Sequence, residues 1–482
     1  MAMFIGRERE LSDLERAYKD GGFQMVAVYG RRRVGKTALL HRFVSDKENV
    51  CYFTALRTTA RENLDGLSAA LAQETTYPDN DLYPGAAVFP EAYPVYRSFA
   101  EAFAALFRMA QRERIIFVID EYPYLAESYP GISSLLQKLI DENKQSSRLF
   151  LVLCGSSMSF MEEQVLGEKS PLYGRRTLQM KLDPFDAFDA AQLLGNPDSA
   201  KAVEFYALAG GVPLYLEQLD ARRSVAWNIA NRLLAPSSIL SNEVENLLLQ
   251  EVRSPSSYNA IVEAIARGCV RPQEISDRTG IKSPLVQQCL SRLERLAIVR
   301  RTEPVGHHKK NQVRYVIADN LFRFHYRFGI RYRTAVESGL AEAAARRIVS
   351  DDLSTFVGPV FEEVCRQWLM RQVAGGELDM IPVEMGSWWG TNPVTRQEEE
   401  VDVVVRGVDG ELVIGECKWN NAPVDASVLG TLRRRAALFG GGENTQLYLF
   451  ARNGFDEACR ERARRAPDVH LVALGEMFGC DG

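Results

Sequence analysis

Short hydrophobic runs alternate with helix-like stretches along the first third of the chain. Four apolar runs have the length of buried strands, and the segments between them repeat apolar residues at helical spacing. Strands that alternate with helices predict an α/β fold, in which a parallel sheet carries helices on both faces. The predicted strands cover residues 23–29, 51–55, 115–119 and 150–153, and the predicted helices cover residues 38–46 and 95–111.

The pattern changes twice in the rest of the chain. Residues 185–250 are mostly helical, and three helical stretches with a turn at Gly280 follow within residues 256–301. Together with strand-like segments at 298–301 and 312–317, these helices form a winged helix-turn-helix pattern. After helical sequence at 319–348, a second α/β segment is predicted, with helices at 361–373 and 428–439 and strands at 401–405, 412–417 and 445–450.

The length of 482 residues predicts about three domains at roughly 150 residues each. The hydrophobic pattern suggests a finer division, with a loop or insertion rich in Pro and Tyr at 74–95. The predicted segments are a nucleotide-binding domain at 1–184, a helical lid at 185–250, a winged helix-turn-helix at 251–318, a helical linker at 319–350 and a C-terminal α/β domain at 351–482.

Composition excludes several classes of protein. Hydrophobic residues make up 46% and charged residues 25%, a globular balance that excludes wholesale disorder and fibrous folds. No apolar run approaches the roughly 18 residues of a membrane-spanning helix, and the charged first ten residues lack the core of a signal peptide. None of the eight Cys residues forms a CxxC pair. We therefore expect a cytoplasmic protein without a membrane partner, in a reducing compartment.

The charge is unevenly distributed. The net charge is −5, yet residues 251–350 contain 18 Lys and Arg against 9 Asp and Glu. A basic block inside an acidic protein is typical of a segment that faces a polyanion, although a solvated helical surface has the same composition.

A phosphate-binding loop follows the first predicted strand. The segment GRRRVGKT matches the pattern GxxxxGK[ST] in full, and the strand before it and the helix after it are the required context. Its glycines let backbone N–H groups surround phosphate oxygens at a helix N-terminus. Lys36 is expected to reach the β- and γ-phosphates of ATP, and Thr37 is expected to ligate Mg²⁺. The predicted nucleotide-binding residues are Gly30, Arg31, Arg32, Arg33, Val34, Gly35, Lys36, Thr37 and Asp120.

An acidic pair ends the strand at 115–119. Asp120 is expected to hold Mg²⁺ through water, and Glu121 is expected to activate the attacking water as a general base. The segment Cys154-Gly-Ser156-Ser157, after the next strand, is a candidate to place a polar group near the γ-phosphate. Arg175 and Arg176 are candidate arginine fingers, although each alone is better explained as a surface arginine. An arginine acting across a subunit interface would require a homo-oligomer.

The winged helix-turn-helix pattern predicts contact with nucleic acid, and specifically with duplex DNA. Packed lids and protein-binding modules share the pattern, so this interpretation depends on the local basic charge. The residues placed on the recognition helix are Lys282, Ser283, Gln287, Gln288 and Arg292, and those placed at the tip of the wing are His307, His308, Lys309 and Lys310.

Carboxylates and a lysine gather near the C-terminus. Glu416 and Lys418 alternate on one predicted strand, so both side chains point to one face. A two-residue turn at Asp409-Gly410 would place Asp402 opposite Cys417, whereas a loop closed between residues 407 and 411 would place it opposite Glu416. Only the second register forms a site, because a slip of one residue reverses the faces, and the sequence leaves both registers open.

These carboxylates suggest a metal-dependent phosphodiesterase. Glu362, near the start of a helix, is a candidate third carboxylate beside Asp402 and Glu416. Three carboxylates around one or two Mg²⁺ ions would activate water, and Lys418 would stabilise developing charge. A hairpin with solvated charges is the alternative, but the apolar run before Glu416 indicates burial. Arg433, Arg434 and Arg435 on the next helix are candidate phosphate contacts or a solvated face.

The chain resembles a known combination of domains. In the first 250 residues, VYGRRRVGKTALL, FVIDEYPYL, LCGSS, SPLYGRR and AGGVPLYL resemble the archaeal-type ATPase family of the wider AAA+/STAND group. The C-terminal part resembles a partner domain of unknown function that is similar to the PD-(D/E)XK nuclease superfamily. Glu362, Asp402, Glu416 and Lys418 match its helix carboxylate, its metal-binding Asp and its ExK motif, whereas Val401 replaces the Pro expected before that Asp.

The resemblance implies a P-loop sheet of the RecA/AAA+ type and a restriction-endonuclease-like α/β domain. A role in mobile-element or phage defence is suggested only by the domain combination.

The leading hypothesis is an ATP-binding and ATP-hydrolysing, DNA-binding protein with a Mg²⁺-dependent nuclease domain. Glu121, Asp402, Glu416 and Lys418 are its predicted catalytic residues. The alternative is an ATP-dependent switch or scaffold that binds DNA or a protein without cleavage, and a third possibility is a DNA-binding regulator whose ATPase is only structural.

Overall fold

The computed structural model describes residues 4–72, 95–252, 254–306, 312–392, 396–440, 442 and 444–479. The chain forms two compact units, Met1–Pro184 and Phe185–Gly482. The predicted insertion at 74–95 lies outside the described residues except for its last residue. The predicted wing tip, His307 to Lys310, lies entirely outside them.

The first unit is a five-stranded parallel sheet in the order β2-β3-β4-β1-β5. The central strands are buried on both faces, which explains their continuous apolar sequence. The predicted parallel α/β sheet is therefore confirmed. The strands are β1 (Gln24–Tyr29), β2 (Val50–Thr54), β3 (Ile115–Asp120), β4 (Leu149–Gly155) and β5 (Leu178–Lys181).

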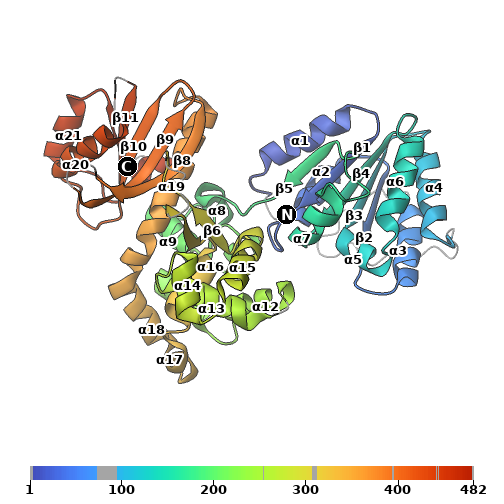
Figure 1. Cartoon of the computed structure of the whole chain (residues 1–482), viewed down its shortest axis with the longest axis horizontal. Coiled ribbons are helices and arrows are strands. Elements are labelled where there is room, and N and C mark those ends of the chain that lie inside the picture. Colours follow the sequence, from blue (N-terminus) through green and yellow to red (C-terminus); the bar gives the residue numbers. More distant parts are fainter. Residues whose placement is uncertain are drawn as a thin grey trace. The chain divides into compact units, whose positions relative to one another are not determined.

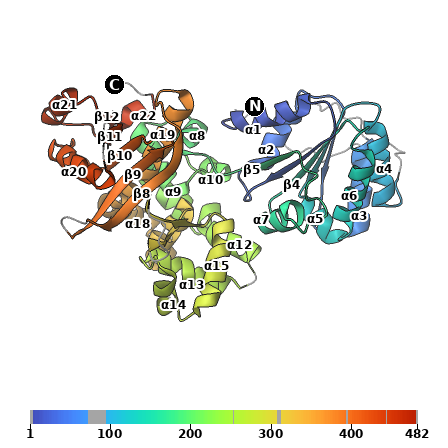
Figure 2. The same ribbon diagram turned by 45° about the horizontal axis from the view of Figure 1, so that its top comes forward.

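Helices cover both faces of this sheet (Figures 1 and 2). One core lies between the sheet and the helices α1 and α2, and a second core lies between the opposite face and α3, α4, α5 and α6. Ser98 begins α4 because its side chain accepts a hydrogen bond from the backbone N–H of Glu101. The helices are α1 (Glu8–Lys19), α2 (Lys36–Val44), α3 (Ala60–Ala72), α4 (Phe99–Ala110), α5 (Tyr122–Ser128), α6 (Ile132–Asn143) and α7 (Met158–Phe160).

The second unit begins with helices and continues into three helices and a hairpin. In the hairpin, β6 and β7 pair antiparallel, with Val299 opposite Ile317. Gly280 separates the second and third helices with a φ of 69°, a conformation that favours glycine. The elements are α8 (Ala187–Leu193), α9 (Ser199–Ala209), α10 (Pro213–Glu217), α11 (Val225–Asn228), α12 (Ile239–Glu251), α13 (Pro255–Ala266), α14 (Pro272–Thr279), α15 (Ser283–Arg295), β6 (Val299–Thr302) and β7 (Arg314–Ile317).

A mixed sheet ends the second unit, in the order β12-β11-β10-β9-β8. Strands β8, β9 and β10 run antiparallel, whereas β10, β11 and β12 are parallel. Helix α19 packs on one face of the sheet, and α20 and α21 pack on the other. The elements are α16 (Asn320–Phe324), α17 (Arg333–Glu337), α18 (Ala341–Arg347), α19 (Leu353–Gly375), β8 (Pro382–Thr391), β9 (Glu398–Gly407), β10 (Leu412–Lys418), α20 (Ser427–Ala436), β11 (Thr445–Ala451), α21 (Glu457–Arg464), β12 (Val469–Ala473) and α22 (Leu474–Met477).

In the second unit, one core reaches from Phe185 to Met477, and a separate core lies between the other face of the sheet and the helices α20 and α21. The helical part of the unit, the three-helix module and the face of the sheet under α19 share the first core. The four segments predicted between residues 185 and 482 are therefore packed into a single body. None of the helices in the described residues combines the length and hydropathy needed to cross a bilayer.

Candidate functional site

The phosphate-binding loop lies between β1 and α2. Gly35 precedes the helix with a φ of 91°, which favours a residue without a side chain. A Cβ atom at Gly30 would collide with the backbone carbonyl of Leu182, so glycine is required there as well. Lys36 is buried, and its Nζ donates to the carbonyl oxygens of Gly30 and Arg31, both at 2.9 Å. Burial lowers the pKa of Lys36, and nearby groups including Glu121 and Asp120 partly oppose that shift.

Asp120 ends β3 and faces this loop. Its Oδ2 accepts hydrogen bonds from the Thr37 hydroxyl at 2.9 Å and from the Tyr52 hydroxyl at 2.8 Å. Its Oδ1 accepts the backbone N–H of Glu121 at 3.0 Å. The structure thus joins the two sequence motifs, which lie more than eighty residues apart, at one carboxylate.

Glu121 has a φ of 54°, an uncommon backbone conformation for a residue with a side chain. Its carboxylate accepts the Ser156 hydroxyl at 2.8 Å and 2.9 Å, and it also accepts the Ser156 backbone N–H at 3.3 Å. Ser156 directly follows β4, so adjacent parallel strands bring the two residues together. Glu121 is therefore held at the carboxyl edge of the sheet, on the side of the phosphate loop.

Both candidate arginine fingers are bonded within their own unit. Arg175 forms a two-pronged ion pair with Asp141, at 3.0 Å and 2.6 Å. Arg176 donates to the carbonyl of Leu166 at 2.7 Å and lies over the ring of Tyr173. Either residue would have to break these contacts before it could act on a nucleotide held by another subunit.

Helix α15 exposes most of the residues predicted to read DNA. Ser283, Gln287 and Gln288 are exposed on it, and Lys282, which directly precedes it, is exposed as well. Arg292 is different, because its guanidinium donates to the carbonyl of Glu251 at the end of α12 at 3.0 Å. Arg292 thus joins α15 to α12, and its contact with DNA stays a prediction.

The β6–β7 hairpin packs on the C-terminal sheet. Val305 N–H donates to the Ser387 carbonyl at 3.1 Å, and Gly306 N–H donates to the Glu384 carboxylate at 3.0 Å. Arg314 lies over the Trp389 ring, 4.4 Å from its centroid. Several arginines of the basic block are also paired with carboxylates: Arg300–Glu363, Arg314–Glu400, Arg331–Asp352 and Arg347–Asp351. The block is thus less strongly basic in the fold than in the sequence.

The C-terminal hairpin has the register that brings the predicted residues together. Gly407 N–H donates to the Glu411 carbonyl at 2.8 Å, and Leu412 pairs with Arg406. Continuing that register places Asp402 opposite Glu416, on the face of the sheet that also carries Lys418. The Cys417 N–H donates to Asp402 Oδ2 at 2.8 Å.

Glu416 is almost fully buried and paired on both oxygens. Its Oε1 accepts Lys418 Nζ at 2.6 Å, and its Oε2 accepts Arg435 Nη1 at 2.5 Å. Of the three arginines predicted on α20, only Arg435 is part-buried at this site, whereas Arg433 and Arg434 are exposed. The burial expected from the apolar run holds for Glu416, whereas the Lys418 side chain is 30% exposed and reaches Glu416 from the edge of the core.

Asp402 and Glu362 lie in an environment that disfavours negative charge. Burial and, to a smaller extent, the Glu416 carboxylate raise the pKa of Asp402 to about 6. Burial and, to a smaller extent, the Asp402 carboxylate raise the pKa of Glu362 to about 8. Arg366, a residue that the sequence did not single out, donates to the Asp402 carbonyl at 2.7 Å.

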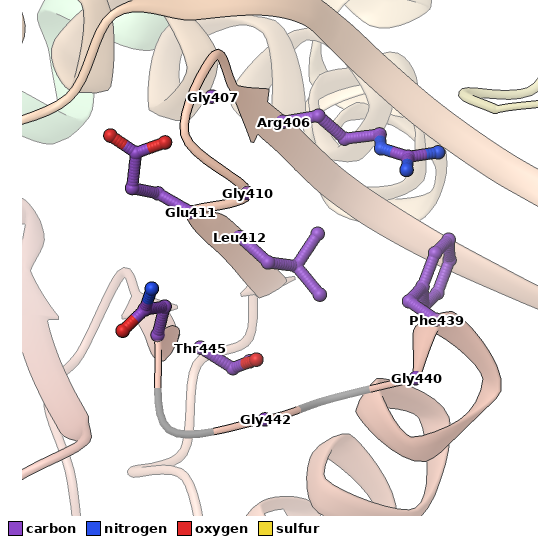
Figure 3. A pocket seen from close by; sticks show the side chains of 10 residues that line it. Arg406, Gly407, Gly410, Glu411, Leu412, Phe439, Gly440, Gly442 and Thr445 are labelled. Carbon is purple, nitrogen blue, oxygen red and sulfur yellow. The ribbon is translucent and has the colours of Figure 1, made fainter.

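The pocket in Figure 3 lies at the other end of β10. It has a volume of about 430 Å³ and is formed where the β9–β10 turn meets the segment before β11. Leu412 begins β10 and Glu416 is near its end, so the predicted carboxylates do not line this pocket. Its lining residues are Arg406, Gly407, Gly410, Glu411, Leu412, Phe439, Gly440, Gly442, Asn444 and Thr445.

Comparisons with known proteins agree with the geometry at the phosphate loop. Residues 4–219 match a family described as an ATPase domain predominantly from Archaea. The first unit therefore has the fold and the phosphate loop of a P-loop ATPase. Residues 325–429 match a second family, described as archaeal and bacterial proteins of unknown function.

Two relatives and one solved structure extend the comparison. An uncharacterised protein of Methanocaldococcus jannaschii is 28% identical over 422 residues, which cover 87% of this chain and 88% of that protein. An uncharacterised ATP-binding protein of the same organism is 42% identical over 48 residues, 10% of this chain and 81% of that protein. A Walker-type ATPase of Pyrococcus abyssi shares the fold, with a TM-score of 0.50 and 21% identity over 67% of this chain and 96% of that chain.

The donor set of the ATPase domain fits a magnesium ion bound with the nucleotide. Thr37 and Asp120 offer a hydroxyl and a carboxylate, the hard oxygen ligands that Mg²⁺ prefers beside substrate phosphates. Such an ion would neutralise phosphate charge, while Lys36 and the loop N–H groups would bind phosphate oxygens.

The C-terminal carboxylates fit the predicted metal centre less well. In the part of the chain that the structure describes, no three His, Cys, Asp or Glu side chains are placed to hold a metal ion. The expected centre of Glu362, Asp402 and Glu416 is therefore not formed as a trio. Asp402 and Glu416 remain on one face, and one or two carboxylates suffice for Mg²⁺ when substrate phosphates complete its coordination.

Replacing Glu362 with Gln is expected to stabilise the second unit at alkaline pH. Because the folded-state pKa is raised, the contribution of Glu362 to stability is present below its unfolded value near 4.5 and is lost as pH rises through about 8. Glu362→Gln removes that loss, and we expect a gain in unfolding free energy on the order of 2–3 kcal/mol at pH 9. The difference should shrink toward pH 5.

Urea unfolding followed by tryptophan fluorescence measures this effect, because all five Trp residues lie in the second unit. Glu363→Gln is the matched control. Arg300 and Arg366 outweigh burial and lower the pKa of Glu363, so this variant should be destabilised at neutral pH. An equal change in both variants, or no dependence on pH, would contradict the assignment.

Proposed function

We propose that the chain is an ATPase that binds Mg²⁺–ATP and couples the nucleotide to nucleic-acid binding. The observation that carries the ATP part is the junction of Thr37, Asp120 and Glu121. The Thr37 hydroxyl contacts Asp120 at 2.9 Å, and Glu121 is bonded to Ser156 on the next strand. In this proposal Lys36 binds the β- and γ-phosphates, and Glu121 takes a proton from the attacking water.

The nucleic-acid part depends on the three-helix module. After the turn at Gly280, Lys282 directly precedes helix α15, which carries Gln287 and Gln288, and all three residues are exposed. Long amide side chains can form paired hydrogen bonds with adenine, and a lysine at the helix start can contact a phosphate. In this proposal, duplex DNA binds to the exposed face of α15. The β6–β7 hairpin has a packing role, because its described residues lie against the C-terminal sheet.

A charge reversal at Lys282 tests this interface. If Lys282 contacts a phosphate, Lys282→Glu should weaken duplex DNA binding by roughly tenfold and reduce the slope of affinity against salt by about one. Fluorescence anisotropy with a labelled duplex, with and without ATP, measures both quantities. Lys138→Glu, an exposed reversal in the ATPase domain, is the control. Equal affinities for both variants would remove α15 from the interface.

A second candidate function concerns the C-terminal face. The observation that favours it is the register that puts Asp402 opposite Glu416 and beside Lys418. In a phosphodiesterase, Asp402 and Glu416 would hold Mg²⁺ together with the substrate phosphate, and Lys418 would stabilise charge on the phosphate. Arg435 would move from Glu416 to the substrate. Without cleavage, the same face would serve an ATP-dependent switch or scaffold.

A further inference from the structure

Tyr52 reaches the nucleotide site from a strand outside the sequence motifs. It lies on β2, where it pairs with Val118, and Thr54 pairs with Asp120 on the neighbouring strand β3. The Tyr52 hydroxyl donates to Asp120 Oδ2 at 2.8 Å. The same oxygen accepts the Thr37 hydroxyl at 2.9 Å, so two hydroxyl groups converge on one side of the carboxylate.

The ring of Tyr52 is held in place by a second aromatic side chain. His41 stacks on it, with the ring centroids 4.7 Å apart and the planes at 27°. His41 lies on α2, one helical turn after Thr37, so the same helix positions the stacking ring and the threonine. Burial lowers the pKa of His41, which favours a neutral ring over a cation at this stack.

We propose that Tyr52 is a positioning residue for the magnesium ion of the ATPase domain, with His41 as its support. The phenol keeps the Asp120 carboxylate turned so that Oδ2 meets Thr37 and Oδ1 meets the Glu121 N–H. Hydrogen bonds to a carboxylate are among the stronger ones in proteins, and they fix its rotation. Without the phenol, the Asp120 carboxylate can rotate. Binding of Mg²⁺ must then also fix this rotation, which makes the binding free energy of the ion less favourable.

The effect is specific for the ion, because Lys36 and the loop backbone bind phosphate without Tyr52. Tyr52→Phe keeps the ring and its stack and removes only the hydroxyl. We expect the Mg²⁺ concentration for half-maximal tightening of ADP binding to rise about three- to tenfold, the loss of one hydrogen bond to a charged group. Affinity in EDTA should not change. Saturating Mg²⁺ should restore most of the ATP turnover rate.

The experiment titrates Mg²⁺ against the binding of mant-ADP, a fluorescent ADP, to the full chain. His41→Phe should behave like wild type, because the stack is kept, whereas His41→Ala should shift the Mg²⁺ midpoint in the direction of Tyr52→Phe. Tyr129→Phe is the matched control. The ring of Tyr129 is partly exposed and stacks on Phe99, in the same unit as Tyr52.

Asp120→Asn separates this inference from the proposed function on which it rests. If Asp120→Asn leaves the Mg²⁺ midpoint unchanged, the metal assignment fails and the role of Tyr52 fails with it. If Asp120→Asn shifts the midpoint and Tyr52→Phe does not, only the role of Tyr52 is wrong. An equal loss of mant-ADP affinity in EDTA and in Mg²⁺, with a lowered melting temperature of Tyr52→Phe, would show a merely structural role and overturn the proposal.

Discussion

Replacing Glu121 with Gln is expected to lower the rate of ATP hydrolysis by about 100- to 1,000-fold while ATP still binds. Gln keeps the size of the side chain and can still accept the Ser156 hydroxyl, which lies 2.8 Å from the Glu121 carboxylate. It cannot take a proton from water. The loss therefore falls on kcat, and mant-ATP affinity should stay within a factor of about three of wild type.

Two other variants separate a loss of nucleotide binding from a loss of the hydrolysis step. Lys36→Ala should lose nucleotide binding itself, since the buried ammonium lies in the phosphate loop. Ser156→Ala should change turnover by less than tenfold, because the Ser156 backbone N–H still bonds the Glu121 carboxylate. Phosphate release and mant-ATP binding are measured on the same samples. Wild-type turnover in Glu121→Gln would show that another group is the base.

Replacing Asp402 with Asn is expected to reduce nucleic-acid cleavage by about 100-fold or more, if the C-terminal face is a phosphodiesterase. Asn keeps the acceptor for the Cys417 N–H, but it removes one of the two carboxylates that face each other across β9 and β10. The ATPase rate should be unchanged. A loss of cleavage with an unchanged ATPase rate would therefore come from the chemistry of this face and not from unfolding.

The assay uses plasmid, linear duplex, single-stranded DNA and RNA, with Mg²⁺ or Mn²⁺, and with or without ATP. Asp409→Asn, in the exposed turn between the two strands, is the matched control and should cut like wild type. Lys418→Ala should lose cleavage as Asp402→Asn does. Cleavage by Asp402→Asn at the wild-type rate would refute the assignment, and no cleavage of any substrate by wild type would favour the ATP-dependent switch.

Local sequence patterns predicted the elements whose burial is strongest. Strands β1, β3 and β4 are apolar throughout because both faces are covered, and the predicted ranges lie within one or two residues of the observed ones. Strands β5, β8 and β12 were missed. All three lie at sheet edges, where one side is exposed and the sequence carries polar residues.

The sequence alone determined the phosphate loop and the acidic pair, because backbone N–H groups, a lysine and a glycine act within one short segment. It also placed Glu416 and Lys418 on one face, because side chains alternate along a strand. Only the tertiary structure decided the register of Asp402, which depends on where the chain closes between Gly407 and Glu411. Only the tertiary structure brought Tyr52 to Asp120 and Arg435 to Glu416, since each pair joins neighbouring elements that are distant in the chain. Pattern along the chain specifies which residues share a face, whereas contacts between elements depend on strand order and helix packing, which no single segment encodes.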